Sequence, residues 1–529
     1  MKKLLYTTLS VIFSIFIFSC NKIIDIDPIS NVGAGAFYKN YNEVNTALAG
    51  CYNGMQGPLY NEWMFTDLRS DNSLQGVPNT SSVDNIELND LDMFTLNATH
   101  SDVYDYWLAA YKNIRAVNYV LGSLGVTFSN GQDNFGTATA QLNDDQKKQL
   151  AGEALIVRAY HYFNLVRLFG GVFLISEPED PQTSKKVGRS SATDIYNFIM
   201  ADLNTAQSIL PRISYSQIAA TDLGRVNIWS AKALLAKVYL TLGRKADALM
   251  LLDDIITNSG YGLLPSYADV FSVSNEMNRE IIFAVRYKAG GFNLGSPFAN
   301  LFAPTGSGSA IVAGDGKGYN FPTTSIQAAF KTSTSSGSDA RKDVTVAVYN
   351  TTKPYVKKFL STVAVSYDAE NDFPVIRFSD VLLMKAEAVG FDGPSGVAVG
   401  IINQVRQRAG AIDYTGTGDF SAGFYKYPSG GDSAINSASG FTKALLNERR
   451  LEFAFENQRF FDMQRLGDAV QMIKDHFAEE YDVFYSRISP KIPLETLQGN
   501  VTKDKLLLPI PQREIDTNNE IPIEQNTGY

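Results

Sequence analysis

The chain has 529 residues, several times the length of a typical domain, and 45% of them are hydrophobic while only 19% are charged. This composition excludes a disordered chain or a coiled coil and predicts at least one large core. The formal net charge is −9 and no dense Lys/Arg tract occurs, so a nucleic-acid partner is not expected. The two cysteines, Cys20 and Cys51, exclude a disulfide framework.

The first residues predict export and a lipid anchor. The sequence MKK is followed by an uncharged, mostly apolar stretch over 4–19, which is shorter than the ~20 residues of a membrane-spanning helix. The stretch ends in IFSC, which resembles the cleavage box of bacterial lipoproteins. A plain secretory signal is less favoured because Ile17 is not small. We therefore predict a signal peptide over 1–19 and lipidation of Cys20, followed by an extended tether to residue 31.

Helical periodicity recurs along most of the remaining chain. Apolar residues at three- and four-residue spacing predict helices over 36–52, 103–121, 145–169, 193–210, 226–243, 245–258, 377–390, 396–408 and 442–466. Within 226–258 the helix pair carries Leu235, Ala236, Tyr239, Ala248 and Leu252 where a tetratricopeptide repeat places its packing residues. The predicted fold is therefore mostly α, a tetratricopeptide-like helical-repeat scaffold.

Three long segments rich in Gly, Ser, Asn and aromatic residues interrupt this pattern, over 59–99, 288–338 and 410–440. Structureless connections rarely exceed ~12–15 residues, so these segments predict either a binding face with a few short strands or a decorated surface. We expect one domain over 20–529, with N-terminal helices over 36–260, a loop-rich segment over 261–376, and C-terminal helices and a tail over 377–529.

Motifs of catalysis are missing from the sequence. The three histidines are isolated, and no nucleophile elbow, phosphate-binding loop or metal-ligand spacing occurs. The best enzyme candidate is the run Glu448, Glu452 and Glu456, which places three carboxyls on one helix face. Several arginines share that segment, which favours structural ion pairs over catalysis. We predict no catalytic residue, no metal and no cofactor.

Four separated segments together resemble the SusD/RagB family of outer-membrane nutrient-binding lipoproteins of Bacteroidetes. The lipoprotein box followed by IDIDP is similar to the start of members, and RAYHYFNLVRLFGGVFLI is similar to their long helix and turn. IRFSDVLLMKAEA and NERRLEFAFENQRFFDMQRLG resemble their C-terminal helices, and LLLPIPQREIDTNNEIPIEQNTGY closes the chain as members do. The resemblance runs from 20 to 529.

This resemblance implies a lipid-anchored, non-enzymatic receptor on the cell surface at the outer membrane, with the family's tetratricopeptide-like scaffold. It implies a SusC-like TonB-dependent transporter as partner and a glycan as ligand. Two alternatives stay open: a surface glycoside hydrolase, and a receptor for peptides or another nutrient. The family motifs are scaffold motifs, so they do not locate the ligand site.

One tryptophan has no packing role that the sequence explains. Trp63 lies in a stretch without helical periodicity, and sugar rings stack on indoles while their hydroxyls bind carboxylates, amides and guanidinium groups. We predict that Trp63 binds glycan and that Trp63→Ala weakens binding with little change in melting temperature. The alternative is that Trp63 pins its loop onto the scaffold. The other residues predicted for this site are Tyr60, Asp67, Arg69, Asn72, Phe292, Phe298 and Tyr319.

Overall fold

The computed structural model describes residues 37–76, 83–179, 181–330, 332–333, 337–394, 396–410, 427, 435–518 and 520–529. The predicted signal peptide, Cys20, the tether and most of the segment 410–440 lie outside these ranges. Helices account for 54% of the residues and strands for 8%, which confirms the mostly α fold class.

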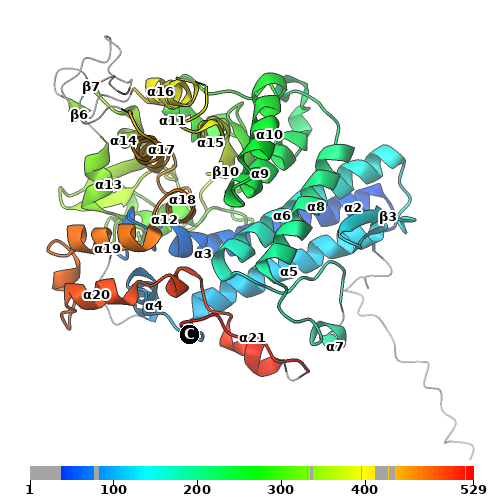
Figure 1. The fold of residues 1–529 in the computed structure, drawn as a ribbon, viewed down its shortest axis with the longest axis horizontal. Coiled ribbons are helices and arrows are strands. Elements are labelled where there is room, and N and C mark those ends of the chain that lie inside the picture. Colours follow the sequence, from blue (N-terminus) through cyan, green and yellow to red (C-terminus); the bar gives the residue numbers. More distant parts are fainter. Residues whose placement is uncertain are drawn as a thin grey trace, which may run out of the picture.

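The N-terminal half is a row of long helices (Figure 1). Neighbours pack in the order α2 and α3 against α5, α5 against α6, and α6 against α8. Helix α6 begins with a capping box in which Asn143 and Gln146 exchange hydrogen bonds, and it ends at Gly170, where φ is 73°. The bounds are α2 Tyr41–Gly54, α3 Gln56–Thr66, α5 Ser101–Ser123, α6 Asp144–Phe169 and α8 Ala192–Ile209.

The same row continues through the repeat-like pair. Helices α9 (Ile228–Thr241) and α10 (Lys245–Asn258) pack against each other, α10 packs on α15 (Phe378–Val389), and α15 packs on α16 (Val397–Ala409). The small side chains of Ala236 and Ala248 are fully buried. The helix pair predicted over 226–258 is therefore confirmed.

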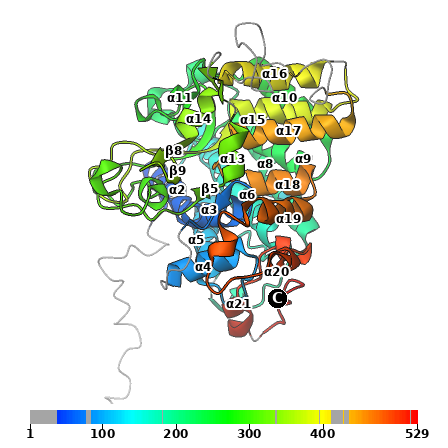
Figure 2. The same ribbon diagram turned by 90° about the vertical axis from the view of Figure 1, so that its left-hand side faces the viewer.

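The remaining helices cover the ends and one side of this row (Figure 2). The loops around the β8–β9 hairpin project from the body (Figure 2), and β9 packs against β5. The bounds are α4 Val83–Asp92, α7 Pro181–Ser184, α11 Tyr267–Val270, α12 Phe298–Phe302, α13 Thr324–Ala329, α14 Ala340–Thr345, α17 Ala438–Glu452, α18 Arg459–Leu466, α19 Ala469–Glu480, α20 Leu494–Asn500 and α21 Gln512–Thr517.

The described strands form five separate antiparallel pairs. The longest joins β4 and β10 inside the core, where Phe373 lies opposite Val285 and Arg377 opposite Ile281. The pairs are β1 Ser73–Leu74 with β5 Phe321–Pro322, β2 Val126–Ser129 with β3 Gln132–Phe135, β4 Ile281–Val285 with β10 Phe373–Arg377, β6 Thr332–Ser333 with β7 Gly337–Ser338, and β8 Val346–Tyr349 with β9 Lys353–Val356.

Two expectations about helices are wrong. The segment 59–99, expected as a loop, contains most of α3 and all of α4. Nearly all residues of α3 are buried, so it lacks the one-sided apolar pattern of a surface helix. The helix expected over 442–466 is broken after Glu452, because the carbonyl of Glu452 accepts hydrogen bonds from Tyr267 and Arg377 instead of continuing the helical ladder. Phe455 and Asn457 then adopt φ of 63° and 59°.

One large hydrophobic cluster runs from Val44 on α2 to Ile523 near the end of the chain, so the N-terminal and C-terminal helices share a core. A smaller cluster around Ala299, Val312 and Val363 lies under the loops of the segment 261–376. None of the helices in the described ranges has the length and apolar character required to cross a bilayer.

Candidate functional site

Trp63 does not lie in a loop but on α3, and its exposed fraction is 1%. Its ring stacks on Tyr319 with centroids 6.1 Å apart and meets the edge of Phe302 at 5.4 Å. No face of the indole is open to a ligand in this arrangement. The geometry favours the alternative role, in which Trp63 fixes the loop-rich segment onto the scaffold.

The other predicted residues do not gather at one surface. Asp67, Arg69, Asn72, Phe298 and Tyr319 are buried, and each has a packing or hydrogen-bonding role in the interior. Arg69, for example, lies between the rings of Phe94 and Phe460 and donates to the carbonyl of Lys505 at 2.6 Å. Only two of the eight are exposed, which are Tyr60 at 42% and Phe292 at 66%.

The three glutamates of the C-terminal motif lie in the interior and are surrounded by cations. Glu448 pairs with Arg341 at 2.6 Å, Glu452 with Arg377 at 3.0 Å and Glu456 with Lys358 at 2.8 Å. We call these six residues, together with Glu280 and Arg408, which pair at 2.7 Å, the Glu452 cluster.

Burial alone would raise the pKa of Glu452, but the guanidinium groups that face it lower the pKa to about 2. A carboxyl with so low a pKa holds no proton at neutral pH and is no general acid. The interpretation of these glutamates as structural ion-pair residues is confirmed.

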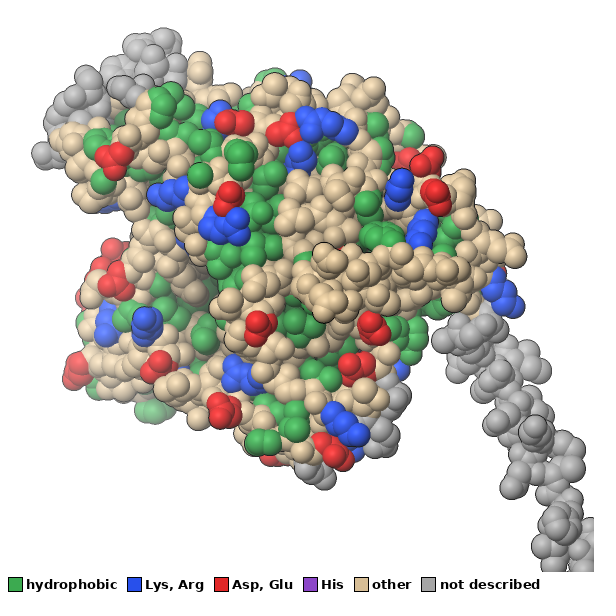
Figure 3. Space-filling view, turned by 45° about the vertical axis from the view of Figure 1, so that its right-hand side comes forward, with side chains coloured by type: hydrophobic (Ala, Val, Ile, Leu, Met, Phe, Trp, Pro, Cys, Tyr) green, Lys and Arg blue, Asp and Glu red, His purple; other side chains and the backbone are tan. Residues whose placement is uncertain are grey.

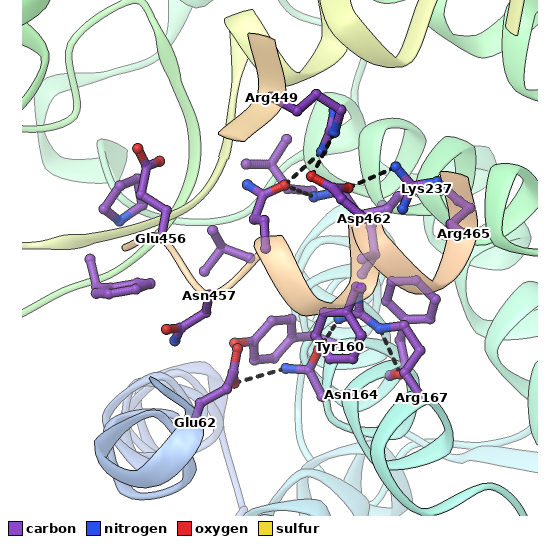
Figure 4. A pocket seen from close by; sticks show the side chains of 18 residues that line it. Glu62, Tyr160, Asn164, Arg167, Lys237, Arg449, Glu456, Asn457, Asp462 and Arg465 are labelled. Atoms are coloured by element: carbon purple, nitrogen blue, oxygen red, sulfur yellow. Dashed lines mark hydrogen bonds and ion pairs between the residues drawn. The ribbon is translucent and has the colours of Figure 1, made fainter. Parts of the chain in front are cut away.

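A small polar cavity lies beside this cluster, between α3, α6 and the turn that joins α17 to α18 (Figure 4). Its volume is about 40 Å³, which is room for about three water molecules and too little for a sugar ring. Glu62 lines the cavity and accepts hydrogen bonds from Asn164 at 3.1 Å and Tyr160 at 3.4 Å. Burial raises the pKa of Glu62 to about 7. The cavity is therefore a feature of the core.

A much larger open groove, of about 840 Å³, lies where α2 and α3 pack against α5. We call it the α3–α5 groove. Its floor is made of small residues that let the helices approach closely. A Cβ atom added at Gly54 would overlap the side chain of Asn113, and one added at Gly57 would lie 3.4 Å from the Cβ of Ala109. Grooves of this volume hold ligands in many proteins.

The groove has a third wall, formed by the loop that follows β4. Asp368 fixes this loop, because its carboxylate accepts the backbone N–H groups of Gly290 and Gly291 at 2.9 Å each. The side chain of Gln56 on α3 donates to the carbonyl of Arg286 at 2.7 Å and so ties the loop to the helix. The third wall is thus held in place by hydrogen bonds before any ligand arrives.

Exposed apolar side chains and polar groups alternate around the groove. Tyr60 on α3 and Leu108 on α5 are 42% and 48% exposed, and Phe292 directly precedes Asn293 of the loop wall. The polar side chains that line the groove are Asn53, Gln56, Asn61, Asp102, Asp105, Lys112, Asn113, Tyr287 and Asn293. Aromatic rings beside amides and carboxylates suit a ligand that has both apolar faces and hydroxyl groups.

A second open groove, of about 800 Å³, is lined by residues of 464–470, 503–507 and 526–527 and has no aromatic side chain in its lining. On the face shown in Figure 3, Lys and Arg side chains lie among Asp and Glu and do not form a continuous basic patch. In the described ranges, no three His, Cys, Asp or Glu side chains are grouped so that they would hold a metal ion. The fold and the groove define a helical-repeat protein that presents an open, aromatic-edged groove.

Comparison with known proteins identifies the family. The SusD family profile matches residues 308–529, and a profile described as "Starch-binding associating with outer membrane" matches residues 37–240. The chain belongs to the SusD family, which confirms the resemblance found in the sequence. It is 26% identical to the SusD-like protein P25 of Formosa agariphila, with 98% of both chains covered, and 22% identical to the SusD-like protein P2 of the same organism, with 100% of both covered.

Solved structures share the fold over almost the whole chain. A laminarin-binding SusD-like protein is 25% identical, with a TM-score of 0.72 and coverage of 93% of this chain and 100% of the other. Surface glycan-binding protein A from Bacteroides thetaiotaomicron, in complex with laminarihexaose, is 19% identical, with a TM-score of 0.69 and coverage of 92% and 99%.

Of the residues predicted from the sequence, only Tyr60 lines the groove, and none of them lies on the wall formed by α5. Asp102, Asp105, Leu108 and Lys112 recur at three- and four-residue spacing, which places them on one face of that helix. An exposed Leu108 between charged residues was the signal available in the sequence. It is a weak one, because scattered exposed apolar residues are common on protein surfaces.

Proposed function

We propose that this protein is a glycan-binding receptor and that the α3–α5 groove is its binding site. The observation that carries the proposal is the groove itself, which is open, has a fixed third wall and is lined by the exposed ring of Tyr60. Two proteins of the same fold support it, since one is named as laminarin-binding and the other holds laminarihexaose.

The proposal includes a place and a partner for the receptor. Lipidation at Cys20 anchors it to the outer membrane on the cell surface, and it delivers glycan to a SusC-like TonB-dependent transporter. The description of the family profile as associating with the outer membrane supports the location. Co-purification in mild detergent tests the partner, and recovery of free monomer alone under several extraction conditions would contradict it.

A surface glycoside hydrolase is the main alternative. A hydrolase needs two carboxyls that flank a scissile bond, one of them protonated. The three glutamates of the C-terminal motif, which were the best candidates for such carboxyls, are buried and form ion pairs. The proposal is therefore a binding protein without turnover. A receptor for peptides is the other alternative, and a glycan titration distinguishes it from the proposed glycan receptor.

Isothermal titration with neutral oligosaccharides and polysaccharides tests the site. We expect Tyr60→Ala to weaken binding about tenfold, the effect of losing a stacking contact worth ~1.4 kcal/mol. The matched control is Phe391→Ala, since Phe391 is 39% exposed in the turn between α15 and α16. Equal affinity of both variants would remove the groove as the site. Release of reducing sugar by the purified protein would contradict the receptor.

A further inference from the structure

The α3–α5 groove follows the axis of α5, and three contacts between its walls fix this direction. One contact is a hydrogen bond of 3.2 Å from a side-chain amide to a backbone carbonyl, and in the other two a Cβ atom added at a glycine would meet a side chain of α5. The pairs are Asn61 with Asp102, Gly57 with Ala109, and Gly54 with Asn113. The numbers fall on one wall as they rise on the other, so α2 and α3 run antiparallel to α5 along the groove.

The lining continues for about one turn beyond these contacts at one end. Gly50 lies four residues before Gly54 on the same face of α2, and Ala116 lies three residues after Asn113 on α5. A Cβ atom at Gly50 would meet no atom within 4 Å, so the space at this end is open. On α5 the lining therefore extends from Asp102 to Ala116.

These two ends give the length of the groove. Asp102 and Ala116 are fourteen residues apart, which is about 21 Å along a helix axis. A sugar unit in an extended chain takes up about 5 Å, so the groove accommodates about four units in a row. We infer that the receptor recognises a run of about four consecutive sugar units. This inference rests on the proposed function of the groove.

The wall formed by α5 offers contacts at intervals close to one sugar unit. Asp105, Leu108 and Lys112 line the groove and are exposed, and their spacing along the helix axis is about 4.5 Å and 6 Å. A monosaccharide or disaccharide leaves some of these side chains in contact with water only. Each added unit gains contacts until the groove is filled, and further units project beyond it.

The test uses linear oligosaccharides of increasing length. Laminari-, malto- and xylo-oligosaccharides of two to six units are titrated calorimetrically beside glucose and xylose. In a series that binds, we expect the binding enthalpy to become more favourable with each unit up to the fourth and to change little from the fourth to the sixth. A pentamer contains two runs of four units and a hexamer three, so the association constant should rise beyond the tetramer by only about twofold and threefold.

A substitution that fills one end of the groove completes the test. Gly50→Phe places a ring in the open space beside Ala116. We expect this variant to lose the gain in enthalpy between the trimer and the tetramer, and to bind the tetramer about threefold or more weakly than the wild type. The control is Gly400→Phe, at an exposed position of α16 where a Cβ atom also meets no atom within 4 Å. It should keep the wild-type dependence on length. Circular dichroism and the melting temperature establish that both variants fold.

The outcomes distinguish the inference from the function on which it rests. A full binding enthalpy already reached with a monosaccharide or disaccharide, or an enthalpy that still grows between the fifth and sixth units, overturns the length of four and leaves the receptor intact. The wild-type dependence on length in Gly50→Phe also overturns it, and so does binding of laminarin, starch or xylan without binding of any oligosaccharide. If neither the oligosaccharides nor these polysaccharides bind, the proposed function is contradicted and the inference falls with it.

Discussion

Trp63 and Tyr60 lie one turn apart on the same helix and have opposite environments, 1% against 42% exposed. Both residues lie in the same short stretch of sequence. Their difference arises because one side of α3 faces the core and the other faces the α3–α5 groove. Tertiary packing decides which of the two side chains is buried, so a few residues of sequence do not predict it.

Trp63→Ala should therefore act on stability. We expect a loss of about 3–5 kcal/mol in the free energy of unfolding, typical of removing a large buried aromatic side chain. Urea unfolding measures it, with Tyr60→Ala as the comparison on the same helix. A Trp63→Ala protein of unchanged stability and reduced glycan affinity would restore the binding role that the sequence indicated.

Asp67 gives stability a dependence on pH. Burial raises the pKa of Asp67 to about 8, against about 3.9 in an unfolded chain. Between these values the unfolded chain releases the proton and the folded protein keeps it. The contribution of this group to stability is therefore full below pH 4 and falls by up to about 1.4 kcal/mol per pH unit as pH rises toward 8.

Asp67→Asn removes this titration while keeping the shape of the side chain. We expect the free energy of unfolding of the variant, relative to that of the wild type, to rise by more than about 1 kcal/mol between pH 5 and pH 7. Urea unfolding at pH 5, 6, 7 and 8 checks the difference, with the exposed Asp392→Asn as control. If the difference in the free energy of unfolding between wild type and variant stays constant over this range, the pKa of Asp67 is not raised by folding.

At the scale of elements, the long helices were predictable, including the buried α6, whereas the short buried helix α3 was not. The expected bounds of the helix over 245–258 agree with α10, and those over 145–169 differ from α6 by one residue. Helix α3 was missed because polar Glu62 and Asn61 are buried beside apolar residues, which erases the period. The groove was missed for a related reason, since it arises only where α3 and α5 meet.

The close approach of α2 and α5 depends on Gly54. The side chain of Asn113, which a Cβ atom at Gly54 would overlap, is held by the carbonyl of Cys51 at 2.9 Å and by His161 at 2.7 Å, so it has little freedom to move. We expect Gly54→Ala to lower the free energy of unfolding by about 1–3 kcal/mol.

Gly50→Ala on the same helix is the matched control. A Cβ atom there meets no atom within 4 Å, so the variant should be unchanged or more stable by up to about 1 kcal/mol through helix propensity. Thermal and urea unfolding of both variants decide the matter. Equal effects of the two substitutions would show that the helices tolerate a wider spacing than the structure indicates.

For the whole molecule, the order of family motifs along the sequence predicted the family and the fold class, because these motifs form the shared scaffold. The same motifs carry no information on the ligand, and its proposed site is built from α2, α3, α5 and one loop. The predicted anchor lies outside the described residues and stays a prediction.

Cys20→Ala tests that anchor. We expect the variant to leave the membrane fraction in cells that lack the partner transporter, since several acyl chains supply the binding energy to the bilayer. Fractionation followed by immunoblotting measures it. A secreted form whose signal peptide is replaced by a plain secretory one serves as the soluble reference, and retention of Cys20→Ala in membranes would contradict lipid anchoring.

The Glu452 cluster also constrains the order in which parts of the chain can fold. Arg377 pairs with Glu280, which lies 97 residues earlier, and with Glu456, 79 residues later. A chain that emerges from its N-terminal end therefore exposes Glu280, and later Arg377, long before residues 448–456 exist. Burying Arg377 before Glu452 and Glu456 are present leaves part of its guanidinium unpaired, which costs several kcal/mol, so this part of the core closes only after residue 456 is present. Such a delay suits the predicted export, in which the polypeptide would cross a membrane before it folds.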